Sequence, residues 1–117
     1  MRTPQQILED HNNSVFTNNP QRMMSDYTDD AILINLGGAY VGKKAIGEAL
    51  QQFIKDMPNM QPVSSPRDLL LVTGDTVFVR WSMKSDLGTI TDAVDTMIVK
   101  ADKIWRQSTN FEICSVK

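Results

Sequence analysis

The segment Asp29-Asp30-Ala31-Ile32-Leu33-Ile34-Asn35-Leu36-Gly37-Gly38 is the point from which the fold can be worked out. Its apolar run, residues 31–36, is short and is closed by the glycine pair, which predicts a strand. A helix is predicted directly after Gly42, because apolar residues recur there at helical spacing until Pro58 ends the run. Those residues are Ile46, Ala49, Leu50, Phe53, Ile54 and Met57.

Two further helices are predicted before this strand. Thr3 can cap the first one, and Pro4 stands where its missing N–H costs nothing. Gln6 can complete a capping box with Thr3. The apolar face of this helix carries Ile7, Leu8, His11 and Val15. Asn19-Pro20 starts a second, short helix by the same logic. The apolar set of that helix is Met23, Met24 and Tyr27.

From residue 68 onward the apolar residues alternate with period two, which is typical of strands. Strands are predicted at residues 69–72, 76–84, 90–99 and 103–116, whereas residues 59–66, with two prolines, indicate a loop or a frayed strand edge. A three-residue turn at 100–102 would place Asp95 opposite Gln107 and Met97 opposite Trp105. Because the connections are short, these strands are expected to be antiparallel neighbours, and the fold class is α+β.

The length, charge and cysteine content of the chain limit the classes of function that it can have. A chain of 117 residues with 41% hydrophobic and 22% charged residues is expected to form one domain, residues 1–117. A net charge of −2 with scattered Lys and Arg argues against a nucleic-acid surface. The single cysteine favours a reducing cytoplasm, and no apolar run is long enough to span a membrane. One histidine and no glycine-rich phosphate loop predict neither a metal nor a cofactor.

Four segments of the chain together carry a resemblance to a known fold. They are residues 29–35, 42–46, 95–99 and 103–105. They resemble the nuclear transport factor 2-like superfamily, in the branch with SnoaL-like polyketide cyclases and ketosteroid isomerases. The resemblance implies a cone with one deep pocket, in which a strongly curved, mixed, mostly antiparallel sheet wraps around the three helices. It also implies a homodimer formed through the sheet face.

The resemblance also implies catalytic positions at His11, Asn35 and Asp95. His11 matches the oxyanion-hole tyrosine of the isomerases, Asn35 matches their base, and Asp95 matches their protonated aspartate. Asn35 cannot take a proton at neutral pH, so the isomerase mechanism as such is not expected. SnoaL-like cyclases use a pocket carboxylate as acid–base catalyst, a role open to Asp95. Burial would raise the pKa of Asp95, and a nearby His11 would lower it and gain a proton. We therefore expect the two side chains to meet directly or through one water.

Alternation predicts which side chains share the pocket face. On the last two strands these are Asp95, Met97, Trp105, Gln107, Thr109 and Phe111. The opposite face, with Val94, Thr96, Ile98 and Arg106, is partly apolar and is a candidate dimer surface. On residues 76–84, pattern points Val77, Val79, Trp81 and Met83 inward, whereas the isomerase match points Phe78, Arg80 and Ser82 inward. Both assignments stay open. The candidate ligand-binding residues are Tyr27, Phe53, Trp81, Met97, Trp105, Gln107 and Phe111.

Each candidate also has a structural explanation. His11 can be a helix histidine bonded to a carbonyl or water, Asp95 an acceptor for a backbone or Gln107 donor, and Asn35 the holder of the turn before Gly37. The leading functional hypothesis is a cofactor-independent pocket protein acting on a small apolar carbonyl compound, as an isomerase, cyclase or hydrolase. The alternative is a non-catalytic dimer that binds a hydrophobic ligand or a partner protein. A carboxylate of Asp95 aimed at open space favours catalysis, and one fully satisfied by protein donors favours binding.

Overall fold

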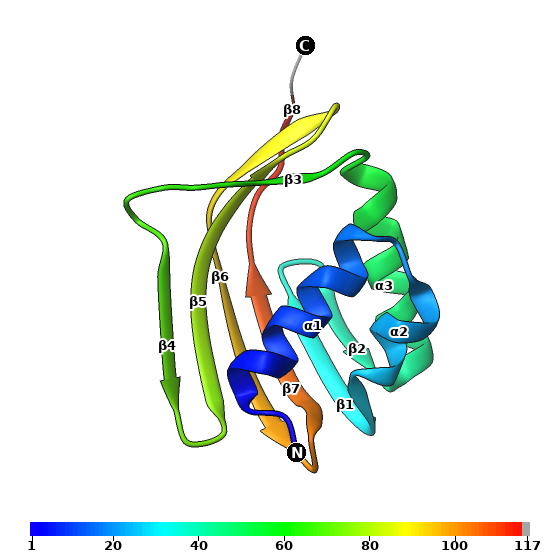
Figure 1. Ribbon diagram of the computed structural model, residues 1–117. Coiled ribbons are helices and arrows are strands. Elements are labelled where there is room, and N and C mark those ends of the chain that lie inside the picture. Colours follow the sequence, from blue (N-terminus) through cyan, green and yellow to red (C-terminus); the bar gives the residue numbers. More distant parts are fainter. Residues whose placement is uncertain (116–117) are drawn as a thin grey trace.

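Three helices pack on one side of a strongly curved sheet whose strands come mainly from the second half of the chain (Figure 1). A computed structural model describes residues 1–115. The helices are α1 (Pro4–Phe16), α2 (Pro20–Ser25) and α3 (Lys43–Asp56). The strands are β1 (Tyr27–Asn35), β2 (Gly38–Val41), β3 (Gln61–Val63), β4 (Leu69–Thr73), β5 (Thr76–Lys84), β6 (Gly88–Lys100), β7 (Lys103–Asn110) and β8 (Cys114–Ser115). The expected α+β class, with three helices in the N-terminal half and a curved mixed sheet, is confirmed.

The sheet is mixed in direction. Its strands run in the order β2-β1-β7-β6-β5-β3, with β4 also paired to β5 and β8 to β6. β1 and β7 are parallel, and the other pairs are antiparallel. Figure 1 shows α1 crossing the concave side of the sheet with α3 beside it, and α3 packs over β1 and β2. A cavity lies between the sheet and these two helices.

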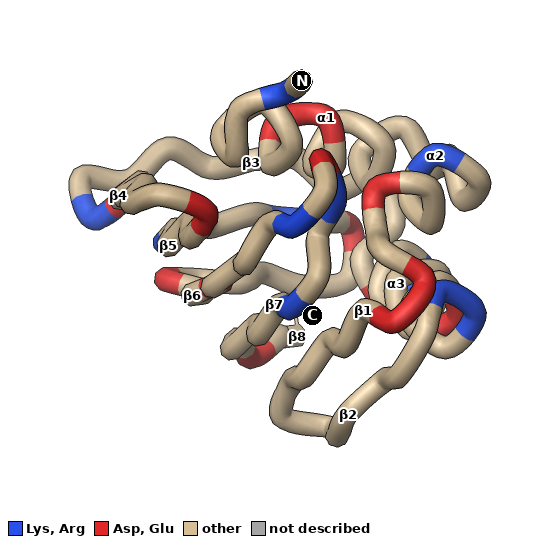
Figure 2. The backbone as a smooth tube through the Cα atoms, turned by 90° about the horizontal axis from the view of Figure 1, so that it is seen from below, with Lys and Arg blue, Asp and Glu red and all other residues tan. Residues whose placement is uncertain are grey.

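Charged positions are mixed in sign over the described chain. Seen from below, Lys and Arg are interspersed with Asp and Glu around the helices and strand ends (Figure 2). Within residues 1–115, no helix has both the length and the apolar character that a membrane span requires.

The start of α1 follows the predicted capping logic. The backbone N–H of Gln6 donates to Thr3 Oγ1 over 3.1 Å, and the backbone N–H of Thr3 donates to Gln6 Oε1 over 2.8 Å. Pro4 follows the cap, where no intrahelical donor is lost. This capping box satisfies two backbone N–H groups at the start of α1, and one face of the helix is buried. The buried residues are Ile7, Leu8, His11, Ser14 and Val15.

The register of the last hairpin differs from the three-residue turn that the sequence predicted. Lys100 pairs with Lys103, and the two turn residues, Ala101 and Asp102, both have positive φ, at 52° and 64°. This is the geometry of a two-residue type I′ turn. The register then shifts between Ile98 and Val99, so the pairing expected for the strand is displaced.

The shift exchanges the cross-strand neighbours of the pocket face. Asp95 pairs with Thr109 and Met97 pairs with Gln107, so the predicted pairs Asp95–Gln107 and Met97–Trp105 are wrong. Val99 pairs with Ile104, and Ile98 pairs with Arg106. Trp105 therefore has no partner on β6 and is the extra residue of a β-bulge. Asp95 and Gln107 still share a face, since the net displacement is two residues.

The structure resolves the open question on β5 in favour of the hydrophobic pattern. Val77 is fully buried, and Val79, Trp81 and Met83 line the enclosed space. A register shift between Trp81 and Met83 brings Ser82 to that space as well. The isomerase match also pointed Phe78 and Arg80 inward, and neither of them lines the cavity. A local bulge, not an inverted strand, accounts for Ser82.

Some elements differ from their predicted extents. Tyr27 was expected on the apolar face of the second helix, but α2 ends at Ser25 and Tyr27 is the first residue of β1. The predicted strand 103–116 is split into β7 and β8, and its residue 116 lies outside the described residues. The short edge strands β2 and β3 carry little apolar pattern, and neither was predicted as a strand with definite bounds.

The core consists of two clusters of buried side chains on the concave side of the sheet. The larger one, beneath α1 and α3, contains Ile7, Leu8, Tyr27, Ala31, Leu33, Ile46, Val77, Met97 and Ile104. The smaller one contains Met57, Met83, Ile90 and Ala93, with Phe53, Met60, Trp81 and Phe111 packed against it.

Candidate functional site

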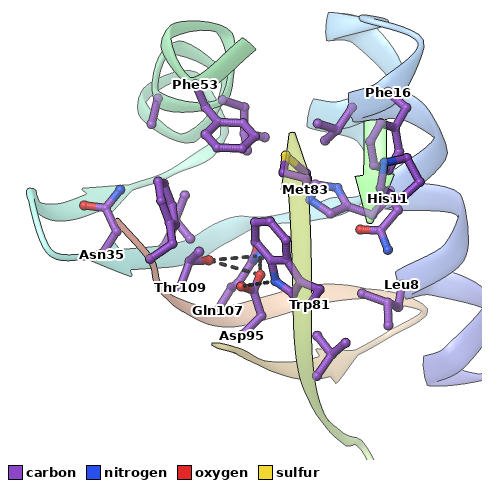
Figure 3. Close-up of a pocket in the computed structure, with 18 of the residues that line it drawn as sticks. Leu8, His11, Phe16, Asn35, Phe53, Trp81, Met83, Asp95, Gln107 and Thr109 are labelled. Carbon is purple, nitrogen blue, oxygen red and sulfur yellow. Dashed lines mark hydrogen bonds between the residues drawn. The ribbon is translucent and has the colours of Figure 1, made fainter. Parts of the chain in front are cut away.

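A cavity of about 190 Å³ lies between α1, α3 and the concave face of the sheet (Figure 3). Its wall is mainly apolar, and Asp95 is the one charged side chain among its lining residues. The lining residues are Leu8, His11, Asn12, Val15, Phe16, Leu33, Asn35, Ala49, Leu50, Phe53, Pro62, Val79, Trp81, Ser82, Met83, Asp95, Gln107, Thr109 and Phe111. Pockets that bind small molecules typically combine such an apolar wall with few polar groups.

Asp95 projects from β6 into this wall and is 8% exposed. Three protein donors hold its carboxylate. Trp81 Nε1–H donates to Oδ1 over 3.0 Å, and Gln107 Nε2–H and the Thr109 hydroxyl donate to Oδ2 over 2.9 and 3.1 Å. Burial raises the pKa of Asp95, and these three hydrogen bonds oppose that rise. Figure 3 shows the three donors gathered around the carboxylate.

A chain of hydrogen bonds leads from Asp95 to α1. Gln107 uses its amide N–H for Asp95, and its Oε1 accepts from the Tyr27 hydroxyl at 2.5 Å. The Tyr27 oxygen lies 3.3 Å from His11 Nε2, and the two rings meet edge-on. His11 and Asp95 are therefore linked through two intervening side chains. No direct hydrogen bond joins His11 and Asp95 among the described residues, so the expected direct contact is not formed; a contact through one water stays a prediction.

The direction of each bond in the chain follows from the carboxylate at its end. Because ionised Asp95 only accepts, Gln107 must turn its amide N–H toward it and its Oε1 toward Tyr27. Tyr27 must then donate to Gln107, which leaves its oxygen to accept from His11 Nε2–H. Burial raises the pKa of the Tyr27 phenol well above 10, so this donor keeps its proton. His11 is assigned as the Nε2–H tautomer on this hydrogen-bond logic.

His11 is neutral near pH 7. Burial lowers its pKa to about 4, although the negative charge of Asp26 works in the opposite direction. The expectation that His11 gains a proton from its surroundings is therefore wrong. Its Nδ1 is buried and has no hydrogen-bond partner in the protein. In the Nε2–H tautomer this atom is an unsatisfied acceptor that is buried from solvent.

The structure brings most of the predicted site residues to one cavity. His11, Asn35, Phe53, Trp81, Asp95, Gln107 and Phe111 line it. The remaining three are placed elsewhere. Tyr27 is fully buried behind His11, and Met97 is fully buried in the core. Trp105 lies outside the lining, with the Arg106 guanidinium 3.9 Å above its ring.

Asn35 has a structural task at the end of β1. Its Oδ1 accepts the backbone N–H of Gly37 over 2.8 Å, which is the turn-holding role that the sequence suggested as its alternative. The side chain still lines the cavity. Its amide N–H groups and the second lone pair of Oδ1 are left for a ligand.

Three aromatic rings form one part of the wall. Phe53 and Phe111 meet edge-on with ring centroids 5.3 Å apart, and Trp81 lies tilted 6.3 Å from Phe111.

The sequence did not single out several other lining residues, including Asn12, Phe16, Pro62 and Ser82. Helical spacing from Leu8 could have suggested Asn12, but a single strand bulge decides the position of Ser82. No cluster of three or more His, Cys, Asp or Glu that could hold a metal occurs within residues 1–115.

Comparisons with known proteins agree with this architecture. Residues 8–107 match the model of the SnoaL-like domain. No curated protein matches the chain. Similar solved structures include IdmH, a candidate polyketide cyclase from Streptomyces antibioticus, at 11% identity and TM-score 0.77, covering 95% of this chain and 93% of that one.

Two further solved structures are similar. A candidate polyketide cyclase from Sinorhizobium meliloti has 18% identity and a TM-score of 0.72, covering 88% of this chain and 92% of its own. A nuclear transport factor 2-like protein of unknown function from Cytophaga hutchinsonii has 12% identity and a TM-score of 0.76, covering 96% of this chain and 92% of its own. At these identities the likeness shows the fold.

The curved sheet, the helices on its concave side and the enclosed cavity define a nuclear transport factor 2-like protein. Because the SnoaL-like model matches most of its length, the chain belongs to the SnoaL-like family.

Proposed function

We propose that this protein binds a small, mainly apolar molecule in the cavity between α1, α3 and the sheet. The observation that carries the proposal is one buried carboxylate, Asp95, set in an otherwise uncharged wall. Three protein donors hold that carboxylate and fill most of its acceptor positions, which favours binding over catalysis. Apolar surface supplies the affinity, and the carboxylate orients the ligand.

The test is a nuclear magnetic resonance screen of uncharged one- and two-ring compounds against ¹⁵N-labelled protein. We expect shifts at lining residues, including the Trp81 indole N–H. Ala49→Phe fills the cavity and should abolish them, whereas Ala39→Phe, on exposed β2, should not. A screen with no binder, or binding that survives Ala49→Phe unchanged, would overturn the proposal.

A second candidate function is acid–base catalysis by Asp95. Burial raises its pKa, which makes the carboxylate a better base than a solvated one. Two structural neighbours are described as candidate polyketide cyclases, which supports chemistry on carbonyl compounds. His11 is a weak base here, because its pKa of about 4 leaves it neutral near pH 7.

The catalytic candidate is tested by hydrogen–deuterium exchange at the acidic C–H of a compact ketone, 2-tetralone, in D₂O. Faster exchange with the protein than with buffer, lost in Asp95→Asn, supports catalysis. Asp92→Asn is the matched control, because Asp92 lies on the same strand and pairs with Arg67. Binding without accelerated exchange leaves the protein a binder.

We also propose that two copies pair through the outer face of the sheet. Register places a row of outer residues side by side across five strands, and its members are Leu71, Phe78, Thr96, Ser108 and Ile34. Leu71 and Ile34 at its two ends are 54% and 52% exposed. A continuous, partly apolar row of this kind suits a self-complementary two-fold contact.

A further inference from the structure

The hydrogen-bond donors around Asp95 are all in use. Trp81 Nε1–H serves Oδ1, whereas Gln107 and Thr109 both serve Oδ2. Gln107 Nε2 also lies 3.5 Å from Thr109 Oγ1, which takes its second N–H. Tyr27 donates to Gln107. None of these groups can give a hydrogen bond to a ligand without breaking one inside the protein.

The acceptors at the same place are not all filled. A carboxylate has about four lone-pair positions, and the protein fills three of those on Asp95. The vacant position is on Oδ1, which receives only the Trp81 indole. His11 Nδ1 is a second acceptor without a partner, but it is buried from solvent and so is not offered to a ligand. The polar part of the cavity is therefore short of donors.

Free donors in the lining lie farther from the carboxylate: the Asn35 amide N–H groups on β1, two strands from β6, and the Ser82 hydroxyl. Ser82 Oγ accepts from the backbone N–H of Asp92, which leaves its own O–H uncommitted. Ser82 stands three residues beyond Val79, the cross-strand partner of Asp95, or about 10 Å along the strand. A carbonyl on a ligand could meet that hydroxyl but would find no donor at Asp95.

The size of the cavity limits what can enter it. A dry apolar cavity of roughly 150 Å³ accepts one benzene ring. At about 190 Å³, this cavity suits one substituted ring or two fused rings. A longer molecule must extend past the exposed lining residues Phe16 and Pro62.

We propose that the cavity selects compact one- or two-ring molecules that present a hydroxyl or amine hydrogen-bond donor to Asp95, and discriminates against matched molecules that carry only ether or carbonyl oxygen there. This refines the proposed binding function and rests on it. The ligand class is that of phenols, ring alcohols and ring amines. The donor fills the vacant position on Oδ1, and the rings pack against Phe53, Phe111 and Trp81.

The experiment compares 2-naphthol, 2-methoxynaphthalene and 2-naphthaldehyde, which share one ring system. Dissociation constants come from shifts of the Trp81 indole N–H signal in ¹H–¹⁵N spectra. A hydrogen bond to a charged group predicts that 2-naphthol binds roughly ten- to a hundredfold more tightly than the other two. Asp95→Asn should remove most of that preference, and the control Asp92→Asn should keep it.

Failure of the refinement differs from failure of the binding function. Equal affinity of all three compounds, with binding still lost in Ala49→Phe, overturns donor selection and leaves the cavity a ligand site. Tighter binding of 2-naphthaldehyde also overturns it. If none of the three compounds binds, both proposals fail. A preference for 2-naphthol that persists in Asp95→Asn assigns the contact to another acceptor and overturns the role of Asp95.

Discussion

The indole N–H of Trp81 on β5 donates to Oδ1 of Asp95 on β6 over 3.0 Å. The two residues are not direct cross-strand partners, since Asp95 pairs with Val79, so the bond runs diagonally across the sheet. It holds one oxygen of the carboxylate while the other takes two donors. This arrangement lets a charge persist in an apolar wall.

Replacing Trp81 with Phe should raise the pKa of Asp95 further, because burial already raises it and the indole hydrogen bond opposes that rise. The ¹³C chemical shift of the Asp95 carboxyl, followed against pH, measures the change. Trp105→Phe is the matched control, since that ring lies outside the cavity lining. A carboxyl titration unchanged by Trp81→Phe would mean that the bond does not govern the charge of Asp95.

The stability of the protein should fall as pH drops from about 6.5 to about 4, and His11 is the cause. In the folded protein its pKa is lowered to about 4, so over this range the unfolded chain binds the extra proton. The difference from the ordinary value corresponds to about 3 kcal/mol in the free energy of unfolding. Burial raises the pKa of Asp95 and gives a trend of opposite sign.

The measurement is urea unfolding at a series of pH values for the parent protein and for His11→Gln. Because His11 is the only histidine in the chain, the variant should lose most of the slope between pH 4 and 6.5. An equal slope in both proteins would show that His11 titrates normally in the fold.

Asp95→Asn should reverse the direction of the hydrogen-bond chain. An amide at position 95 that turns its N–H toward Gln107 makes Gln107 offer its oxygen there and its N–H to Tyr27. Tyr27 then donates to His11 Nε2, and the imidazole proton moves to Nδ1. Imidazole ¹⁵N shifts distinguish the two tautomers. An Nε2–H signal in both proteins would contradict the assigned direction.

Much of the fold could be predicted because its signals are local. Residues three or four positions apart are enough to recognise the capping box of Thr3 and Gln6 and the apolar spacing of α3. The register of β6 and β7 could not be predicted in the same way. It depends on a bulge at Trp105, and no short-range pattern marks that bulge. Short edge strands such as β3 depend on pairing with a distant neighbour.

The sequence predicted part of the cavity lining but not the hydrogen bonds that connect its residues. His11, Asn35 and Asp95 do line one cavity. The path between His11 and Asp95 depends on Tyr27, whose place at the start of β1 follows from where α2 ends. Burial, which only the packed structure reveals, lowers the pKa of His11 and so reverses its expected charge.

Arg2→Ala should destabilise the fold. Arg2 Nη1 lies 3.1 Å from Asp26 Oδ1 and from Asp10 Oδ2, and the Asp26 side chain is only 1% exposed. Removing the guanidinium leaves Asp26 with Arg22 alone, at 3.6 Å. Loss of a hydrogen-bond partner from a buried carboxylate predicts a drop of about 2 kcal/mol in the free energy of unfolding. Arg22→Ala, at a more exposed position, should cost less, and the opposite order would contradict this ranking.

The paired state should be visible by sedimentation at micromolar concentration. We expect a dimer for the parent chain and a monomer for Ile34→Lys, because the charge would lie within the outer-face contact. Leu87→Lys is the control, since Leu87 is 56% exposed but lies in the turn between β5 and β6. A parent chain that sediments only as a monomer rules out the proposed contact.

The most direct test of the central claim is a crystal structure of the protein with 2-naphthol. The claim is that the cavity takes a compact apolar molecule and that Asp95 is its polar contact. The predicted result is a ring system enclosed by Phe53, Phe111 and Trp81, with the naphthol oxygen within hydrogen-bond distance of Asp95 Oδ1. Naphthol density only on the outer surface, or inside the cavity with its oxygen turned away from Asp95, would contradict it.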